Sequence, residues 1–110
     1  MHSVEVIGEG SRTSCEPVVY WYLGEYLFNY SIDLTVVHMD LSDEGVYGWC
    51  MRESEYEFII QIDENLEGDE YMQTLLHECY HVMQHVLEIP RCEICAYFSE
   101  KINLDKYNQS

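Results

Sequence analysis

The strongest pattern of apolar and polar positions in this chain covers residues 69–87. With about 100° of rotation per residue, one side of a helix over this stretch is apolar. That side comprises Met72, Leu75, Leu76, Cys79, Met83, Val86 and Leu87. The other side carries three of the five histidines, at positions 77, 81 and 85, with glutamates at 70 and 88. The pattern predicts a helix with one face in the core and a polar face turned to an opening.

Shorter apolar runs before this helix predict strands. They cover residues 32–39, 46–51 and 56–62, are rich in β-branched and aromatic side chains, and are separated by polar turn segments. Because the three runs follow one another closely, we expect a small antiparallel meander. Residues 4–7 form either a further short strand or a loose arm.

Two more helices complete the expected fold. The first begins between residues 14 and 17, where Pro17 is tolerated in a first turn and Glu16 suits the positive helix end, and it runs to about residue 29. Pro90 breaks the histidine-bearing helix. A last helix then runs from about residue 91 or 92 to 104, before a frayed tail. The 110 residues thus predict one α+β domain with an N-terminal helix, a three-stranded antiparallel sheet, the histidine-bearing helix and a C-terminal helix.

Net charge and cysteine content limit the partners and the cellular compartment that we expect. The net charge is −16 with only five Lys and Arg, which disfavours nucleic-acid binding and favours a basic protein or peptide partner. We expect no membrane span, because no apolar run reaches about 18 residues. Five cysteines without a secretory signal sequence predict free thiols in the cytoplasm.

The polar face of the predicted helix contains His77-Glu78-Cys79-Tyr80-His81, which matches the pattern HExxH. A spacing of four places both imidazoles on one side of a helix, one turn apart, so that they can reach one metal ion. The Glu78 carboxylate can take a proton from a water on that metal. Chance alone would give the pattern in roughly three chains in a hundred of this composition, so its helical context carries much of the argument.

A catalytic zinc ion usually has three protein ligands, and the third must come from another element because one straight helix cannot surround an ion. The last predicted helix offers Glu93 and Glu100. We favour Glu93, because it lies near the start of that helix and follows the histidine pair after a tight turn. His85 is the other candidate, one turn beyond His81.

Cys92 and Cys95 form a CxxC sequence at the start of the last predicted helix. A structural zinc site would need a second pair of Cys or His at similar spacing, and the other cysteines, at 15, 50 and 79, stand alone. We interpret Cys92 and Cys95 as small apolar residues packed near the site. A mixed histidine–cysteine metal site is the alternative.

Residues 75–81 (LLHECYH) followed by residues 93–98 (EICAYF) resemble the gluzincin metallopeptidases. The layout over about residues 32–104 is closest to ImmA/IrrE-type peptidases, minigluzincins and short phage-encoded zincin-like proteins. In those proteins a short sheet precedes the HExxH helix, and a glutamate on the next helix completes the site. The resemblance implies His77, His81 and Glu93 as ligands of one zinc ion and Glu78 as general base. The extended C-terminal region of larger members is missing.

The resemblance implies a zinc-dependent endopeptidase whose substrate is a protein or peptide. We expect the edge of strand 46–51 to pair with an extended peptide beside the cleft. Oxyanion stabilisation would come from Tyr97, Tyr107, His85 or His38. Two alternatives remain: a zincin-like binding module without catalysis, and an acidic decoy that mimics DNA.

Overall fold

The computed structural model describes residues 1–8, 15–90 and 93–109. Its elements, in chain order, are β1 (Ser3–Ile7), α1 (Glu16–Tyr26), β2 (Asp33–Met39), the short 3₁₀ helix η1 (Ser42–Glu44), β3 (Gly48–Arg52), β4 (Glu57–Asp63), α2 (Gly68–Val86) and α3 (Glu93–Gln109). The α+β class is confirmed. Expected helix starts at residues 14, 91 and 92 lie outside the described residues.

The strands form one mixed sheet of four strands in the order β1-β2-β4-β3. β1 pairs with β2 and β2 pairs with β4, both in parallel, and only β3 runs antiparallel to its neighbour β4. The expected three-stranded antiparallel meander is therefore wrong. The connection 40–47, which contains η1, leads from β2 to β3 at the edge of the sheet and leaves the position next to β2 open. The following strand, β4, fills that position and lies between β2 and β3. Residues 4–7 belong to a strand and not to a loose arm.

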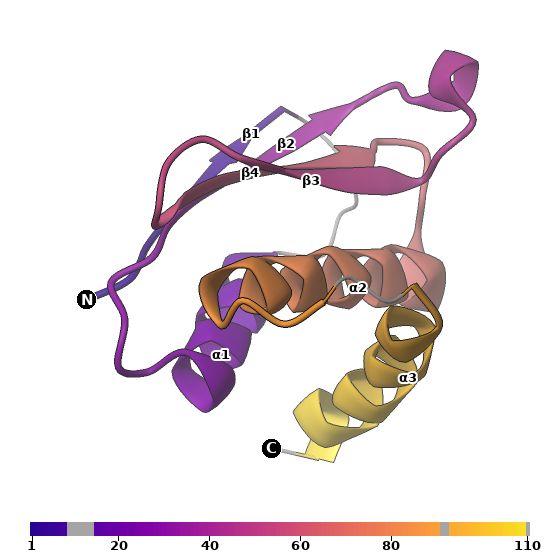
Figure 1. Cartoon of the computed structure of the whole chain (residues 1–110). Coiled ribbons are helices and arrows are strands. Elements are labelled where there is room, and N and C mark those ends of the chain that lie inside the picture. The colour runs from indigo at the N-terminus through magenta and orange to yellow at the C-terminus, as the bar shows by residue number, and fades with distance from the viewer. Residues whose placement is uncertain (9–14, 91–92, 110) are drawn as a thin grey trace.

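The α-helices of the described chain all lie on one face of the sheet (Figure 1). Residues on β2 and β4 alternate accordingly, because successive side chains of a strand point to opposite faces. The side that faces the helices is buried and comprises Leu34, Val36, His38, Phe58, Ile60 and Ile62. α2 lies beneath the sheet with β3 directly over it, and α3 packs against α2 (Figure 1).

α2 has the extent expected from its apolar pattern, within one residue at each end. Its core face is fully buried at Leu75, Leu76 and Cys79, and burial of a leucine contributes about 1.5–3 kcal/mol to folding. The helix ends before Glu88, which adopts a left-handed φ of 57°.

α3 is longer than expected. The sequence predicts an end near residue 104 and a frayed tail, but the helix continues to Gln109. Tyr107 explains the difference, because its ring packs edge-on against Trp21 with 5.4 Å between the centroids. This aromatic contact ties the last turns of α3 to α1.

Candidate metal centre

The two motif histidines come from successive turns of α2 and are buried, with 8% of His77 and 2% of His81 exposed. Their Nε2 atoms lie 3.2 Å apart. The helix therefore holds both imidazoles with their Nε2 atoms directed to one point, as the spacing of four predicts.

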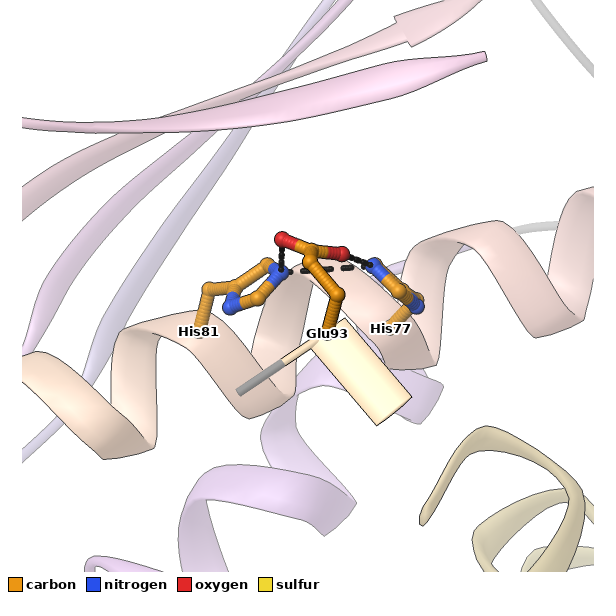
Figure 2. Close-up of side chains that lie close together, drawn as sticks. All are labelled: His77, His81 and Glu93. Carbon is orange, nitrogen blue, oxygen red and sulfur yellow. Dashed lines mark hydrogen bonds and ion pairs between the residues drawn. The ribbon is translucent and has the colours of Figure 1, made fainter. Parts of the chain in front are cut away.

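Glu93, at the start of α3, reaches across to the same point (Figure 2). Its Oε2 lies 3.1 Å from His77 Nε2, and its Oε1 lies 3.2 Å from His81 Nε2. Each of these three residues offers one ligand atom, and these atoms lie within 4.8 Å of one another. The structure thus brings together the three residues expected as ligands.

Each imidazole is oriented through its other nitrogen. His77 Nδ1 lies 2.9 Å from Glu100 Oε2, and His81 Nδ1 lies 2.7 Å from Gln84 Oε1. Gln84 Nε2 donates to the carbonyl oxygen of Pro90 at 3.2 Å, which fixes the amide with its oxygen towards His81. Both partners of the Nδ1 atoms are acceptors, so each Nδ1 carries the hydrogen. Each Nε2 then presents a lone pair to the centre.

Among the described residues, the atoms that meet at the centre are therefore acceptors: two imidazole nitrogens and the two carboxylate oxygens of Glu93. Acceptors at 3.1–3.2 Å repel one another unless a cation lies between them. One added proton would bridge one pair, whereas a metal ion engages all three residues together. Tetrahedral zinc with bonds of 2.0–2.1 Å places its ligand atoms about 3.3 Å apart, which matches these separations.

The charges around the centre also favour a cation. Glu78 and Glu100 are buried, with 4% and 9% exposed, and Glu93 completes a set of three carboxylates. Burial raises the pKa of Glu100, while the hydrogen bond from His77 acts in the opposite direction. A divalent cation would offset the repulsion among these carboxylates.

The centre opens into a cavity of about 610 Å³ between α2, the start of β3 and the first turns of α3. Its lining comprises Gly45, Val46, Tyr47, Gly48, Trp49, Glu70, Gln73, Thr74, His77, Glu78, His81, Glu93, Tyr97 and Glu100. The strand expected to border the cleft, β3, is an edge strand of the sheet, and its first residues form one wall of the cavity.

Gly48 allows β3 to lie unusually close to α2. A Cβ atom at this position would lie 3.0 Å from the Gln61 carbonyl oxygen, 3.1 Å from Thr74 Cγ2 and 3.4 Å from Glu78 Cγ. The strand backbone therefore packs directly over the side chain expected to act as general base.

Of the four residues considered for oxyanion stabilisation, Tyr97 alone lines the cavity. Its ring centroid lies 4.7 Å from that of His77. Tyr107 instead packs against α1, and the His85 ring faces Phe58 at 5.9 Å. His85 is also outside the group of donor atoms found among the described residues.

His38 belongs to a separate buried contact. Its Nε2 lies 2.6 Å from the Tyr71 hydroxyl, and its ring stacks on that of Tyr71. Burial lowers the pKa of His38, so the imidazole is neutral near pH 7. This histidine helps join β2 to α2 and does not line the cavity.

The cysteines contribute no ligand within the described residues. Cys95 is exposed on α3 and stands outside the donor group, and Cys92 lies outside the described residues. Cys79, inside the motif, is fully buried in the core, and burial raises the pKa of its thiol well above the ordinary value. It packs as an apolar residue, which explains a cysteine at this motif position.

Sequence reasoning missed two features of the site. Gln84 was not identified, although its position three residues after His81 places it on the same face of α2. Glu100 was considered only as a metal ligand, whereas it orients His77 through Nδ1. Glu93 and Glu100 lie two turns apart on α3, so both face α2 and spacing alone does not assign their roles.

Comparison of the chain with protein-family models, curated proteins and solved structures finds no match. None of the helices in the described ranges is both long and apolar enough to cross a membrane. The geometry of the site therefore carries the functional argument.

Proposed function

We propose that this chain is a zinc-dependent metallopeptidase of gluzincin type, with His77, His81 and Glu93 as ligands of one zinc ion. The observation that carries the proposal is the convergence of three acceptor groups, two imidazole Nε2 atoms and the Glu93 carboxylate. The Nδ1 hydrogens of the two imidazoles already bond to Glu100 and Gln84. Tetrahedral N and O donors of this kind suit zinc. All three residues line the cavity, so an ion that they held would be accessible to water and substrate, as a catalytic site requires.

Zinc at such a site supplies a polarised scissile carbonyl and a water whose pKa falls towards about 7. Glu78 is placed to act as general base, because it lines the same cavity beside the ligand pair. Its carboxylate takes a proton from the attacking water as the new C–O bond forms. It then gives that proton to the amine nitrogen as the C–N bond breaks.

β3 is placed to hold the substrate. It is the edge strand beside the cavity, and an extended peptide can add to such an edge through main-chain hydrogen bonds. The close approach of β3 to Glu78, allowed by Gly48, would place the bound peptide bond near the base. Tyr97 is the residue best placed to donate a hydrogen bond to the developing oxyanion.

The first test combines metal content with peptide cleavage. We expect purified protein to hold one zinc per chain by mass spectrometry of the metal and to cleave members of a random peptide library. Glu78→Gln should retain zinc and lose at least about a hundredfold in kcat, because the base is removed and the ligands remain. The exposed Glu88→Gln is the matched control and should retain activity.

A second control separates the histidines of α2. His81→Ala should abolish stoichiometric zinc, whereas His85→Ala should retain it, because His85 stands outside the donor group. Zinc lost equally from both variants would contradict the proposed site. Stoichiometric zinc without cleavage of any library member would leave a binding module and would refute the peptidase.

A further inference from the structure

The cavity contains one carboxylate to which the proposed chemistry gives no role. Among the residues that the structure describes, four glutamates line it, at positions 70, 78, 93 and 100. Glu93 is a proposed ligand, Glu78 the proposed base and Glu100 the partner of His77 Nδ1. Glu70 remains, in the first turn of α2.

Glu70 is exposed and available to a ligand. Within the described ranges, its carboxylate makes no ion pair or side-chain hydrogen bond; the backbone carbonyl of Glu70 accepts from Thr74 Oγ1 at 2.9 Å. Glu70, Thr74 and Glu78 follow a spacing of four, so they form one row along the floor of the cavity. A peptide bound along this row would extend from the proposed general base, Glu78, to Glu70.

No lysine or arginine lines this cavity in the described part of the chain. Arg52 is held by the carbonyl oxygens of Ser54 and Glu55, and Lys106 lies near Glu25. A cationic group that enters the cavity near Glu70 therefore meets a carboxylate that is not paired with a lysine or arginine of the described residues.

We propose that Glu70 sets the substrate preference of this site by pairing with a lysine or arginine side chain of the bound peptide. This inference rests on the proposed function for its reacting centre. Glu70 precedes His77 by seven residues, about 10 Å along the helix axis. An extended peptide covers that distance in about three residues, so the basic residue lies about three positions from the cleaved bond, on one side only.

The position of the basic residue in the peptide distinguishes pairing with Glu70 from general electrostatic attraction to the acidic chain. A chain with net charge −16 attracts any basic peptide, wherever its charge lies, and salt screens that attraction. Pairing with Glu70 instead favours a basic residue at one position. The expected preference for lysine over norleucine there is about five- to tenfold in kcat/KM, as for a partly exposed charged hydrogen bond.

The experiment uses zinc-loaded protein and blocked octapeptides with a neutral background, in which each position in turn is lysine, norleucine or glutamate. Glu70→Gln should remove the lysine preference at the single position, and Glu70→Lys should replace it with a preference for glutamate. Asp69→Asn is the matched control, because Asp69 is a neighbouring exposed acid outside the cavity lining. That variant should keep the preference.

Two results of the cleavage assay would overturn the inference. One is a lysine preference that survives in Glu70→Gln, and the other is an equal loss of preference in Asp69→Asn. Binding of the same peptides to the Glu78→Gln protein, followed by the fluorescence of the cavity residue Trp49, gives a readout without turnover. If the wild type cleaves no peptide, the proposed function fails. Binding that depends on both Glu70 and lysine still supports this inference, and binding independent of Glu70 rejects it.

Discussion

α2 and α3 both contribute residues to the candidate metal centre, but they are held in the molecule in different ways. α2 buries ten of its 19 residues, in contact with the sheet, α1 and α3. α3 buries only four of its 17 residues. The outer side of α3 is apolar and exposed, at Ile94, Phe98 and Ile102.

α3 docks through a few apolar residues, among them Ala96 and Leu104, and through polar contacts. Glu100 bonds to His77, and Asn103 accepts a hydrogen bond from the Tyr26 hydroxyl. The histidine pair is therefore fixed by the apolar core, whereas the position of Glu93 depends in part on polar contacts that water can replace. This difference implies that Glu93 is the adjustable residue of the site. A metal ion that binds all three residues would also hold α3 in place.

The largest expected effect tests the anchoring of α2. Leu76→Ala should lower the free energy of unfolding by about 2–5 kcal/mol, because Leu76 is fully buried and a cavity would remain. Ile102→Ala on α3 should change it by less than about 0.5 kcal/mol, because that side chain is 62% exposed. Denaturant titration of both variants measures the contrast. Equal losses would contradict the unequal anchoring of the two helices.

The next effect concerns the link between the helices. Glu100→Ala should weaken zinc binding about 10- to 100-fold, because His77 loses the acceptor that fixes its orientation. Glu100→Gln should recover part of that loss, since an amide oxygen can still accept from Nδ1. Competition with a chelator of known affinity measures both. Asp105→Asn, at an exposed position of α3, is the control; unchanged affinity in Glu100→Ala would show that His77 needs no such partner.

The smallest effect tests the docking of α3 alone. Tyr26→Phe removes the hydroxyl that donates to Asn103 and should destabilise the docked helix by about 0.5–1.5 kcal/mol. Hydrogen exchange followed by mass spectrometry should show faster exchange in α3 peptides and unchanged exchange in α2 peptides. Faster exchange in both helices would mean that they open as one unit.

The donor residues could be predicted from sequence because their geometry is local. A spacing of four fixes two imidazoles on one side of a helix, whatever the rest of the fold. The short break at Pro90 then limits which residues of the next helix can reach the two imidazoles. The structure assembles His77, His81 and Glu93 accordingly. Their occupancy by zinc and the peptidase activity stay predictions.

Strand pairing could not be predicted, because alternation of apolar residues identifies a strand but not its neighbour. The partner of β2 depends on how the connection 40–47 travels, and that path is set by tertiary contacts. The same limit applies to Glu100. Its role depends on how α3 lies against α2, which is a matter of a few ångströms between two helices.

The missing side chain at Gly48 also has an evolutionary consequence. A Cβ atom there would lie 3.0 Å from the Gln61 carbonyl oxygen and 3.1 Å from Thr74 Cγ2, so both must shift slightly, and of the two only the Thr74 side chain can become smaller. Homologues that keep this close approach of strand to helix should therefore retain glycine at this point. Those that replace it should carry alanine or serine in place of Thr74. Such coupled variation would mark descent of the cleft itself, in sequences too divergent to be related by the five-residue motif alone.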